Sequence, residues 1–230
     1  MITVRRSADR GHINHGWLDT YHTFSFGEYR DLSQMGFRSL RVINEDRVAG
    51  GQGFGTHPHA NMEILTYVLS GALEHKDSLG SGGVIRPGDI QRMSAGTGIA
   101  HSEFNASATE SVHLLQIWLL PSKKEMPPGY AQVKRDVPLD DWCLLASPDG
   151  RDGSISMGCD ALVWASRLSA GSESALPLAA NRYGWLQVVS GDLDLSGFDL
   201  HAGDGASMEK VATPDLHAKT ASHVLFFDLA

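Results

Sequence analysis

The chain repeats itself, because two short motifs recur in the same order in its two halves. "YVLSGALEH" (residues 67–75) resembles "QVVSGDLDL" (187–195), and "IRPGDIQRM" (85–93) resembles "LHAGDGASM" (200–208). The offsets are 120 and 115 residues, so the second copy is five residues shorter in the loop between the motifs. Self-similarity in a fixed order indicates a duplicated supersecondary unit. The chain is therefore expected to fold into two related halves.

Both halves show the pattern of short strands rather than of helices. Runs such as "EILTYVLSG", "VHLLQIWLLP", "WLQVVSGDLDL" and "SHVLFFDLA" are separated by Gly, Pro, Asn and Asp. Short β-rich runs bounded by turn residues are typical of a sandwich or barrel. The sequence thus predicts an all-β chain of two β-sandwich or barrel domains that arose by internal duplication.

A boundary between the halves is expected after Leu120. The segment "PSKKEMPPGYAQ" contains three prolines and three charged residues and has few apolar residues. Such composition is typical of a linker. We predict an N-terminal domain at residues 1–120, a linker at 121–132 and a C-terminal domain at 133–230.

Composition excludes several classes of protein. The 230 residues carry a net charge of −8, so binding to nucleic acid or to an acidic membrane surface is disfavoured. No apolar run approaches the roughly 20 residues of a membrane-spanning helix, and no secretory signal is seen. The two cysteines, Cys143 and Cys159, do not make a disulfide framework. We expect a cytoplasmic protein.

Two motifs in the first half combine polar side chains at alternate positions. "GTHPHA" contains His57 and His59 around Pro58, and "GIAHSEFN" contains His101 and Glu103. In a strand, residues i and i+2 face the same side, so each motif would direct two side chains inward. Proline removes a backbone donor, which favours an edge strand for the first motif. Two neighbouring strands would then form a metal site of three imidazoles and one carboxylate.

The repeat provides an internal control for this interpretation. Shifted by the two offsets, the four positions become Pro177, Ala179, Leu216 and Ala218. The second half keeps the turns of the framework and lacks the polar side chains, while His217 lies one position out of register. The histidines are therefore not needed to build the fold. The alternative, that the histidines are loop residues and the glutamate is solvated surface, is disfavoured by this comparison.

The ligand types restrict the metal. Imidazole suits Fe, Cu, Ni and Zn, and a carboxylate favours Fe(II) or Mn(II). A structural zinc site usually contains cysteine, whereas this set leaves coordination positions open. A second carboxylate, Glu63, lies four residues after His59 and is an alternative ligand. We predict Glu103 as the ligand and Glu63 as a carboxylate outside the metal's coordination sphere.

The sequence does not decide which residues line the site. Four apolar residues flank the motifs, either as the lining of an aromatic-binding cavity or as core: Phe54, Met62, Met93 and Phe104. Three histidines of an N-terminal segment that would cover a barrel face are not assigned to the metal: His12, His15 and His22.

The motifs resemble the cupin superfamily and, more narrowly, the pirin family. The resemblance rests on "GTHPHANMEILTYVLSGALEHKDSLG" with "GDIQRMSAGTGIAHSEFN" and on the opening "RGHINHGWLDTYHTFSFGEYRD", and it weakens after about residue 130. It implies a bicupin with one metal ion in the N-terminal barrel. The family's metal pattern carries over to this chain residue by residue: His57, His59, His101 and Glu103.

The resemblance also implies an activity. Bacterial pirin-like proteins of this kind act as quercetin 2,3-dioxygenases, which open the central ring of a flavonol with O2 and release carbon monoxide. Glu103, or a bound water, would take the proton of the 3-hydroxyl group. The expected cofactor is one divalent transition metal ion, with Fe(II) favoured and Mn, Co, Ni, Cu or Zn as alternatives. The partners are the flavonol and O2, and the duplicated barrel favours a monomer.

Two other functions remain open. A metal-loaded regulatory protein that binds a partner would share the fold and the metal, as eukaryotic pirin does. A different enolisable aromatic substrate is also compatible, because cupins carry many activities on one framework.

Overall fold

The computed structural model describes residues 1–211 and 214–230, and these are almost entirely strand. The described residues form two compact units. The N-terminal unit consists of Gly11–Arg135 and Ile155–Cys159, and the C-terminal unit of Met1–Arg10, Asp136–Ser154 and Asp160–Ala230. Within the described ranges, no helix has the length and apolar character needed to span a membrane.

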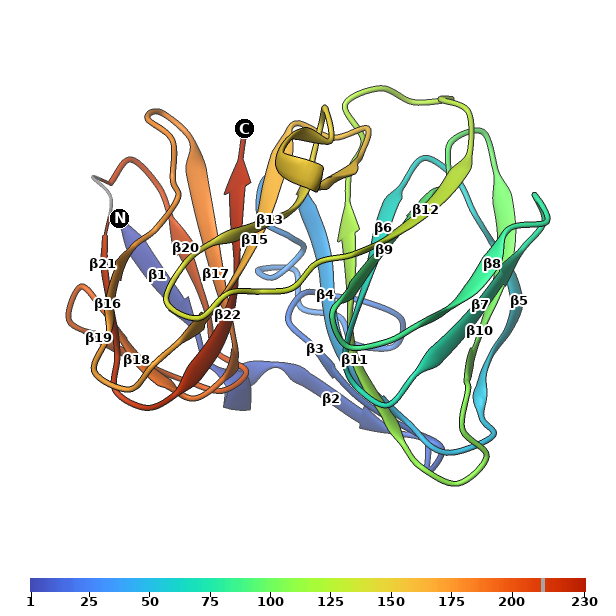
Figure 1. Cartoon of the computed structure of the whole chain (residues 1–230), viewed down its shortest axis with the longest axis horizontal. Helices are drawn as coiled ribbons and strands as arrows, with labels where there is room; N and C mark the ends of the chain where they lie inside the picture. The colour runs from blue at the N-terminus through green and yellow to red at the C-terminus, as the bar shows by residue number, and fades with distance from the viewer. Residues whose placement is uncertain (212–213) are drawn as a thin grey trace. The chain divides into compact units, whose positions relative to one another are not determined.

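The N-terminal unit contains a large and a small antiparallel sheet (Figure 1). The strand order of the large sheet is β12 (Gly129–Lys134), β9 (Asp89–Ser94), β6 (Glu63–Ser70), β11 (Val112–Leu119), β4 (Leu40–Val48), β3 (Leu18–His22) and β2 (Gly11–Asn14). The order of the small sheet is β5 (Gly53–His59), β10 (Ile99–Asn105), β7 (Leu73–Asp77) and β8 (Gly82–Ile85). The short strand β14 (Ile155–Ser156) also belongs to this unit.

The C-terminal unit repeats this plan. Its large sheet contains β1 (Ile2–Arg5), β20 (Gly205–Met208), β17 (Tyr183–Ser190), β22 (Ser222–Leu229), β15 (Ala161–Leu168) and β13 (Cys143–Ser147), in that order. Its small sheet contains β16 (Glu173–Ala175), β21 (Asp215–Ala218), β18 (Asp192–Leu195) and β19 (Phe198–His201). Two short 3-10 helices are η1 (Ser7–Asp9) and η2 (Arg151–Gly153).

The repeated motifs fall on equivalent elements of the two units. The first motif forms the turn between β6 and β7 and the turn between β17 and β18, where Gly71 and Gly191 have φ values of 77° and 87°. The second forms the turns before β9 and β20, where Gly88 and Gly203 have φ values of 91° and 84°. A left-handed backbone favours glycine, which explains why these residues recur. The predicted all-β bicupin fold is confirmed.

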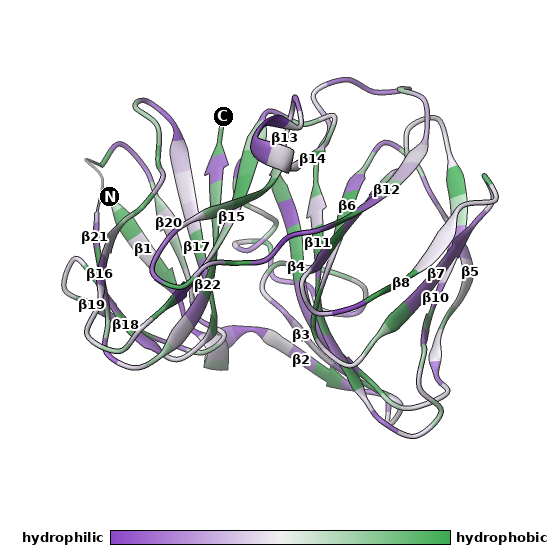
Figure 2. Ribbon diagram, viewed as in Figure 1, coloured by the Kyte–Doolittle hydropathy of each residue, from purple (hydrophilic) through white to green (hydrophobic). Residues whose placement is uncertain are grey.

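Strand alternation separates an inner from an outer face. Along β10, Ile99, His101, Glu103 and Asn105 are buried, whereas Phe104 is 40% exposed. Figure 2 shows hydrophilic and hydrophobic residues interleaved along the strands. The inner face of β10 therefore carries both His101 and Glu103, as its sequence predicts.

The interiors of the two units differ at equivalent positions. Strands β7 and β10 correspond to β18 and β21, since each pair is adjacent in its small sheet. Where the N-terminal unit has His75, His101 and Glu103, the C-terminal unit has three buried apolar residues in one core cluster: Leu195, Leu216 and Ala218. The second interior is therefore filled with hydrocarbon.

The boundaries of the compact units differ from the predicted 1–120, 121–132 and 133–230. Residues 129–134 form β12, which pairs with β9 in the large sheet, so the predicted linker contains part of a strand. The first strand, β1, pairs with β20 of the C-terminal unit. Composition indicated a linker because prolines and charges precede β12, but edge strands tolerate polar residues.

A substitution tests whether the second interior depends on apolar packing. Leu216→His would place an imidazole among the apolar residues of the core cluster, and we expect a loss of roughly 2–5 kcal/mol in the free energy of unfolding. Urea unfolding measures this loss. The control is His217→Ala, which changes the neighbouring side chain on the opposite face and should cost less than about 1 kcal/mol. Equal unfolding midpoints for Leu216→His and the wild type would contradict this packing.

Candidate metal centre

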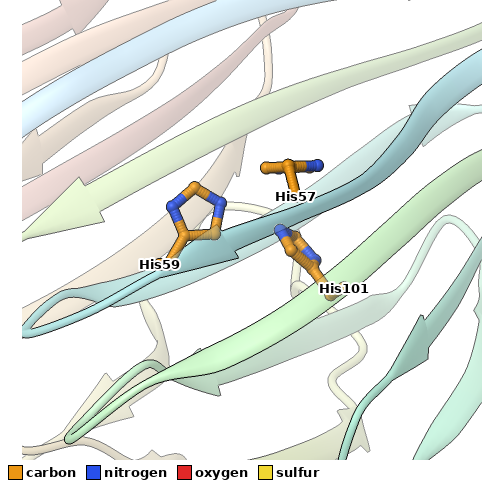
Figure 3. Close-up of side chains that lie close together, drawn as sticks. All are labelled: His57, His59 and His101. Carbon is orange, nitrogen blue, oxygen red and sulfur yellow. The ribbon is translucent and has the colours of Figure 1, made fainter.

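Three imidazoles meet where β5 and β10 pair. In the antiparallel register His57 lies opposite His101, and His59 lies opposite Ile99. Strand β5 is the edge of its sheet, and Pro58 is exposed, as expected for a residue that cannot donate to a ladder. Figure 3 shows the three rings projecting toward one another from the two strands. Their ligand nitrogens all lie within 4.8 Å of one another.

Hydrogen bonding and burial distinguish the two nitrogens of each imidazole ring. Nδ1 of His57 lies 2.8 Å from the carbonyl oxygen of Gly55, which leaves Nε2 facing the group. Nε2 of His59 and Nε2 of His101 are buried, and neither has a hydrogen-bond partner within the described residues. A buried polar atom without a partner is costly, so these nitrogens fit a bound cation.

Burial favours the neutral form of His59 and His101. Desolvation, together with a smaller contribution from His57, lowers the pKa of His59 to about 4. Desolvation also lowers the pKa of His101 to about 3, with contributions from the neighbouring histidines. Neutral imidazole is the form that binds metal, so protons do not compete for these nitrogens near neutral pH.

Glu103 is buried in an adjoining group. Its carboxylate lies within 4.8 Å of ligand nitrogens of His75 and His101, while His57 and His59 form their own group with His101. The side chain of Gln116 donates to both carboxylate oxygens, at 3.1 and 2.9 Å. Thr66 donates to Oε1 of Gln116 at 2.9 Å, which orients that amide. Burial raises the pKa of Glu103 to about 7, although hydrogen bonds to this carboxylate from Gln116 and Thr66 oppose the shift.

Glu63 lies apart from both groups. Its neighbours on β6, Ile64 and Thr66, face the cavity and Glu103, so alternation turns Glu63 to the other side of the sheet. There it accepts a hydrogen bond from Ser94 at 2.7 Å. This placement supports the prediction that Glu63 is not a ligand.

A cavity of about 510 Å³ opens onto the histidines. Its walls include the three imidazoles and Glu103, aromatic rings and a set of polar side chains. The aromatic residues are Trp17, Phe26, Phe54 and Trp118. The polar residues include His15, Thr20, His22, Asn44, Asp46 and Gln116. Size and composition fit a site for one small aromatic ligand.

The polar wall comes from strands of the large sheet. Asn44 pairs in register with His22 on one side and with Gln116 on the other. Nδ1 of His22 lies 2.8 Å from Oδ1 of Asn44. Asp46, two residues along, is 5% exposed, and burial raises its pKa to about 7, while the neighbouring Thr20 opposes the shift.

Comparisons with known proteins identify the family of this chain. The quercetin 2,3-dioxygenase of Escherichia coli (strain K12) is 47% identical over 229 residues, covering all of this chain and 99% of that protein. Residues 3–119 match the family model described as Pirin, and residues 144–229 match the one described as quercetinase C-terminal cupin domain. The chain belongs to the pirin family.

Two solved structures support the fold. The bacterial pirin YhhW of Escherichia coli in complex with nickel(II) has a TM-score of 0.95 at 47% identity and covers 100% of this chain and 99% of that chain. A quercetin 2,3-dioxygenase structure from Acinetobacter baumannii has a TM-score of 0.82 at 22% identity, with 98% of this chain and 85% of that chain covered. At that identity the second likeness concerns the fold alone.

Several residues of the pirin site were not assigned from sequence. Gln116 is a polar residue within the apolar run "VHLLQIWLL", which is a signal that could have marked it. His75 and Asp77 repeat the i, i+2 pattern on β7. Of the four flanking apolar residues, Phe54 lines the cavity, Met93 is core with Met62 packed against its cluster, and Phe104 faces outward.

The raised pKa of Asp46 predicts a pH-dependent stability in the metal-free protein. Asp46 is protonated in the folded state up to about pH 7, but in the unfolded state only to about pH 4. The folded wild type therefore loses stability relative to Asp46→Asn as pH rises from 4 to 7, by roughly 2–4 kcal/mol. Urea unfolding with a chelator present, at pH 5 and pH 8, measures this change.

The control for this measurement is Glu74→Gln, which alters an exposed carboxylate of the same unit. Its stability relative to the wild type should change little between the two pH values. If the difference in stability between Asp46→Asn and the wild type is also the same at pH 5 and pH 8, the carboxyl of Asp46 is charged at both pH values. The predicted pKa shift is then wrong.

Proposed function

We propose that this chain is a metal-dependent dioxygenase that opens the central ring of a flavonol such as quercetin with O2 and releases carbon monoxide. The observation that carries the proposal is the convergence of three imidazoles on one wall of an aromatic cavity, with the buried Nε2 atoms of His59 and His101 lacking partners within the described residues. The names of the 47% identical relative and of the nickel complex of YhhW agree with it.

We assign the metal to His57, His59, His101 and Glu103. Two adjacent strands hold all four side chains, and Glu103 shares its group with His101. The carboxylate favours Fe(II) or Mn(II), of which we propose Fe(II), and nickel is the ion bound in the YhhW complex. When bound, a divalent transition metal supplies Lewis acidity and a redox centre for chemistry with O2.

The cavity walls suit a flat, hydroxylated aromatic molecule. Trp17 and Phe54 pack edge to face, with ring centroids 5.3 Å apart, and offer an apolar wall. Trp118 packs against His59 at 4.9 Å, and its indole N–H has no hydrogen-bond partner in the described part of the chain. That N–H and the carboxyl of Asp46 are available to hydroxyl or carbonyl groups of a bound flavonol.

Glu103 is the base that we assign to the reaction. Its carboxylate lines the cavity that would hold the flavonol, beside His101. Gln116 contacts both of its oxygens and holds the group in place. Glu103 would take the proton from the 3-hydroxyl group of the flavonol as ring opening begins.

Oxygen uptake with quercetin tests the proposal. Metal-free protein is reconstituted anaerobically with Fe(II), Mn(II), Co(II), Ni(II) or Cu(II), and carbon monoxide is measured alongside O2. We expect matched uptake and release with at least one metal, and a loss of at least 100-fold in His101→Ala and Glu103→Ala. The control is Glu63→Ala, which should keep its metal and measurable turnover.

Two outcomes would contradict the proposal. Full metal loading without O2 uptake would point to another aromatic substrate or to a regulatory binding role. Metal-free Glu63→Ala together with metal-bound Glu103→Ala would exchange the roles of the two carboxylates.

A further inference from the structure

We infer that Asp77 and His75 are positioning residues that determine which nitrogen of His101 is offered to a metal. They form a chain of contacts, Asp77 to His75 to His101, behind the imidazole group. The inference rests on the proposed role of His101 as a ligand, and it does not depend on the identity of the substrate.

The chain lies on β7, which pairs with β10 on the side away from β5. Nε2 of His75 lies 3.3 Å from Oδ2 of Asp77, and Nδ1 of His75 lies 3.4 Å from Nδ1 of His101. The side chains of His75 and Asp77 are both 0% exposed. Solvent is therefore excluded from both contacts.

Both members of the chain are held in place. Oδ1 of Asp77 accepts hydrogen bonds from the backbone N–H groups of Leu79 at 2.9 Å and Ser81 at 3.0 Å, which turns Oδ2 toward His75. The ring of His75 stacks on Tyr130 with centroids 4.9 Å apart. These contacts restrict the rotation of each side chain.

The contacts assign the protons. A carboxylate only accepts, so Nε2 of His75 carries the proton that faces Asp77. A neutral imidazole carries one N–H, so with Nε2 of His75 donating to Asp77 its Nδ1 is an acceptor. The proton between the two histidines then belongs to Nδ1 of His101. This leaves the lone pair of His101 on Nε2, the buried nitrogen without a partner among the described residues.

The same contacts argue against His75 as a ligand. His75, His101 and Glu103 lie close enough together to hold an ion. Both ring nitrogens of His75 are already engaged, however, one by Asp77 and one by His101. In His57 and His59 a nitrogen remains available, and the C-terminal unit has Leu195 where His75 would be. His75 therefore accompanies the metal histidines and is not required by the fold.

Asp77→Asn tests the proton assignment. The amide oxygen can keep the bonds from Leu79 and Ser81, so its NH2 group faces His75 and forces Nε2 to accept. His75 must then donate from Nδ1, and His101 must move its proton to Nε2. We expect Ni(II) affinity, measured by competition with a chelator and without flavonol, to fall 10–100-fold.

The control is Glu45→Gln. Glu45 forms a carboxylate–histidine pair with His113 at 2.9 Å in the same unit, and neither residue belongs to the metal groups. Its Ni(II) affinity should match that of the wild type. Thermal unfolding of the metal-free variants confirms that each is folded. Wild-type Ni(II) affinity in Asp77→Asn would overturn the inference.

Two substitutions of His75 separate positioning from packing. His75→Asn keeps an acceptor near the position of Nδ1 but loses the ring, whereas His75→Phe keeps the ring on Tyr130 but has no acceptor. Positioning predicts tighter Ni(II) binding by His75→Asn than by His75→Phe, and the reverse order would overturn the inference. Loss of all metal in both, as in His101→Ala, would make His75 a ligand and also overturn it.

The two proposals fail separately in these experiments. Ni(II) binding is measured without substrate, so an absence of quercetin turnover leaves the positioning role untouched. Undiminished Ni(II) binding by His101→Ala would remove the premise of the positioning role.

Discussion

Desolvation of a polar cluster is the physical constraint on which this site depends. Burial is the first cause of the pKa shift at His59, His101, Glu103 and Asp46. It lowers the pKa of the bases and raises the pKa of the acids, so without an ion all four groups tend toward neutrality. A divalent cation would reverse this preference at the carboxylate, because its charge favours the ionised form.

The β-sandwich stabilises this buried cluster because neighbouring strands provide hydrogen-bond partners for its polar groups. Gln116 on β11 binds both oxygens of Glu103, and Thr66 on β6 binds Gln116. Strand β7 pairs with β10 on the side away from β5 and places His75 next to His101. The Nε2 atoms of His59 and His101 have no hydrogen-bond partner within the described ranges. The framework therefore leaves unsatisfied the atoms that a metal would use.

The two units show that the framework and the chemistry are separable. Both keep the glycine turns and the same strand order around β10 and β21. In the C-terminal unit, Leu216 and Ala218 occupy the positions of His101 and Glu103 and belong to an apolar core cluster. Hydrocarbon packing stabilises that interior, whereas hydrogen bonds between side chains organise the polar interior of the N-terminal unit.

Patterns along the chain were enough to predict the fold and the face of each candidate ligand. The repeat identified the duplicated fold, and alternation around Pro58 and Ser102 identified the face on which the ligand candidates lie. The segment predicted as a linker contains the start of β12, because sheet pairing at an edge does not require an apolar pattern. The cavity wall formed by Asn44 and Asp46 was not predicted, since both lie on β4, which is distant in sequence from its partner strand β11.

The sequence by itself determined the two-fold repeat, the strand periodicity and the face of each candidate ligand, because these depend on neighbours along the chain. Only the tertiary structure decided which strands meet. It placed β7 beside β10, so that Asp77 and His75 lie behind His101, and it brought Gln116 to Glu103. It also turned Glu63 away from the cavity. These relations arise from pairing between strands distant in sequence, which alternation within a single strand does not specify.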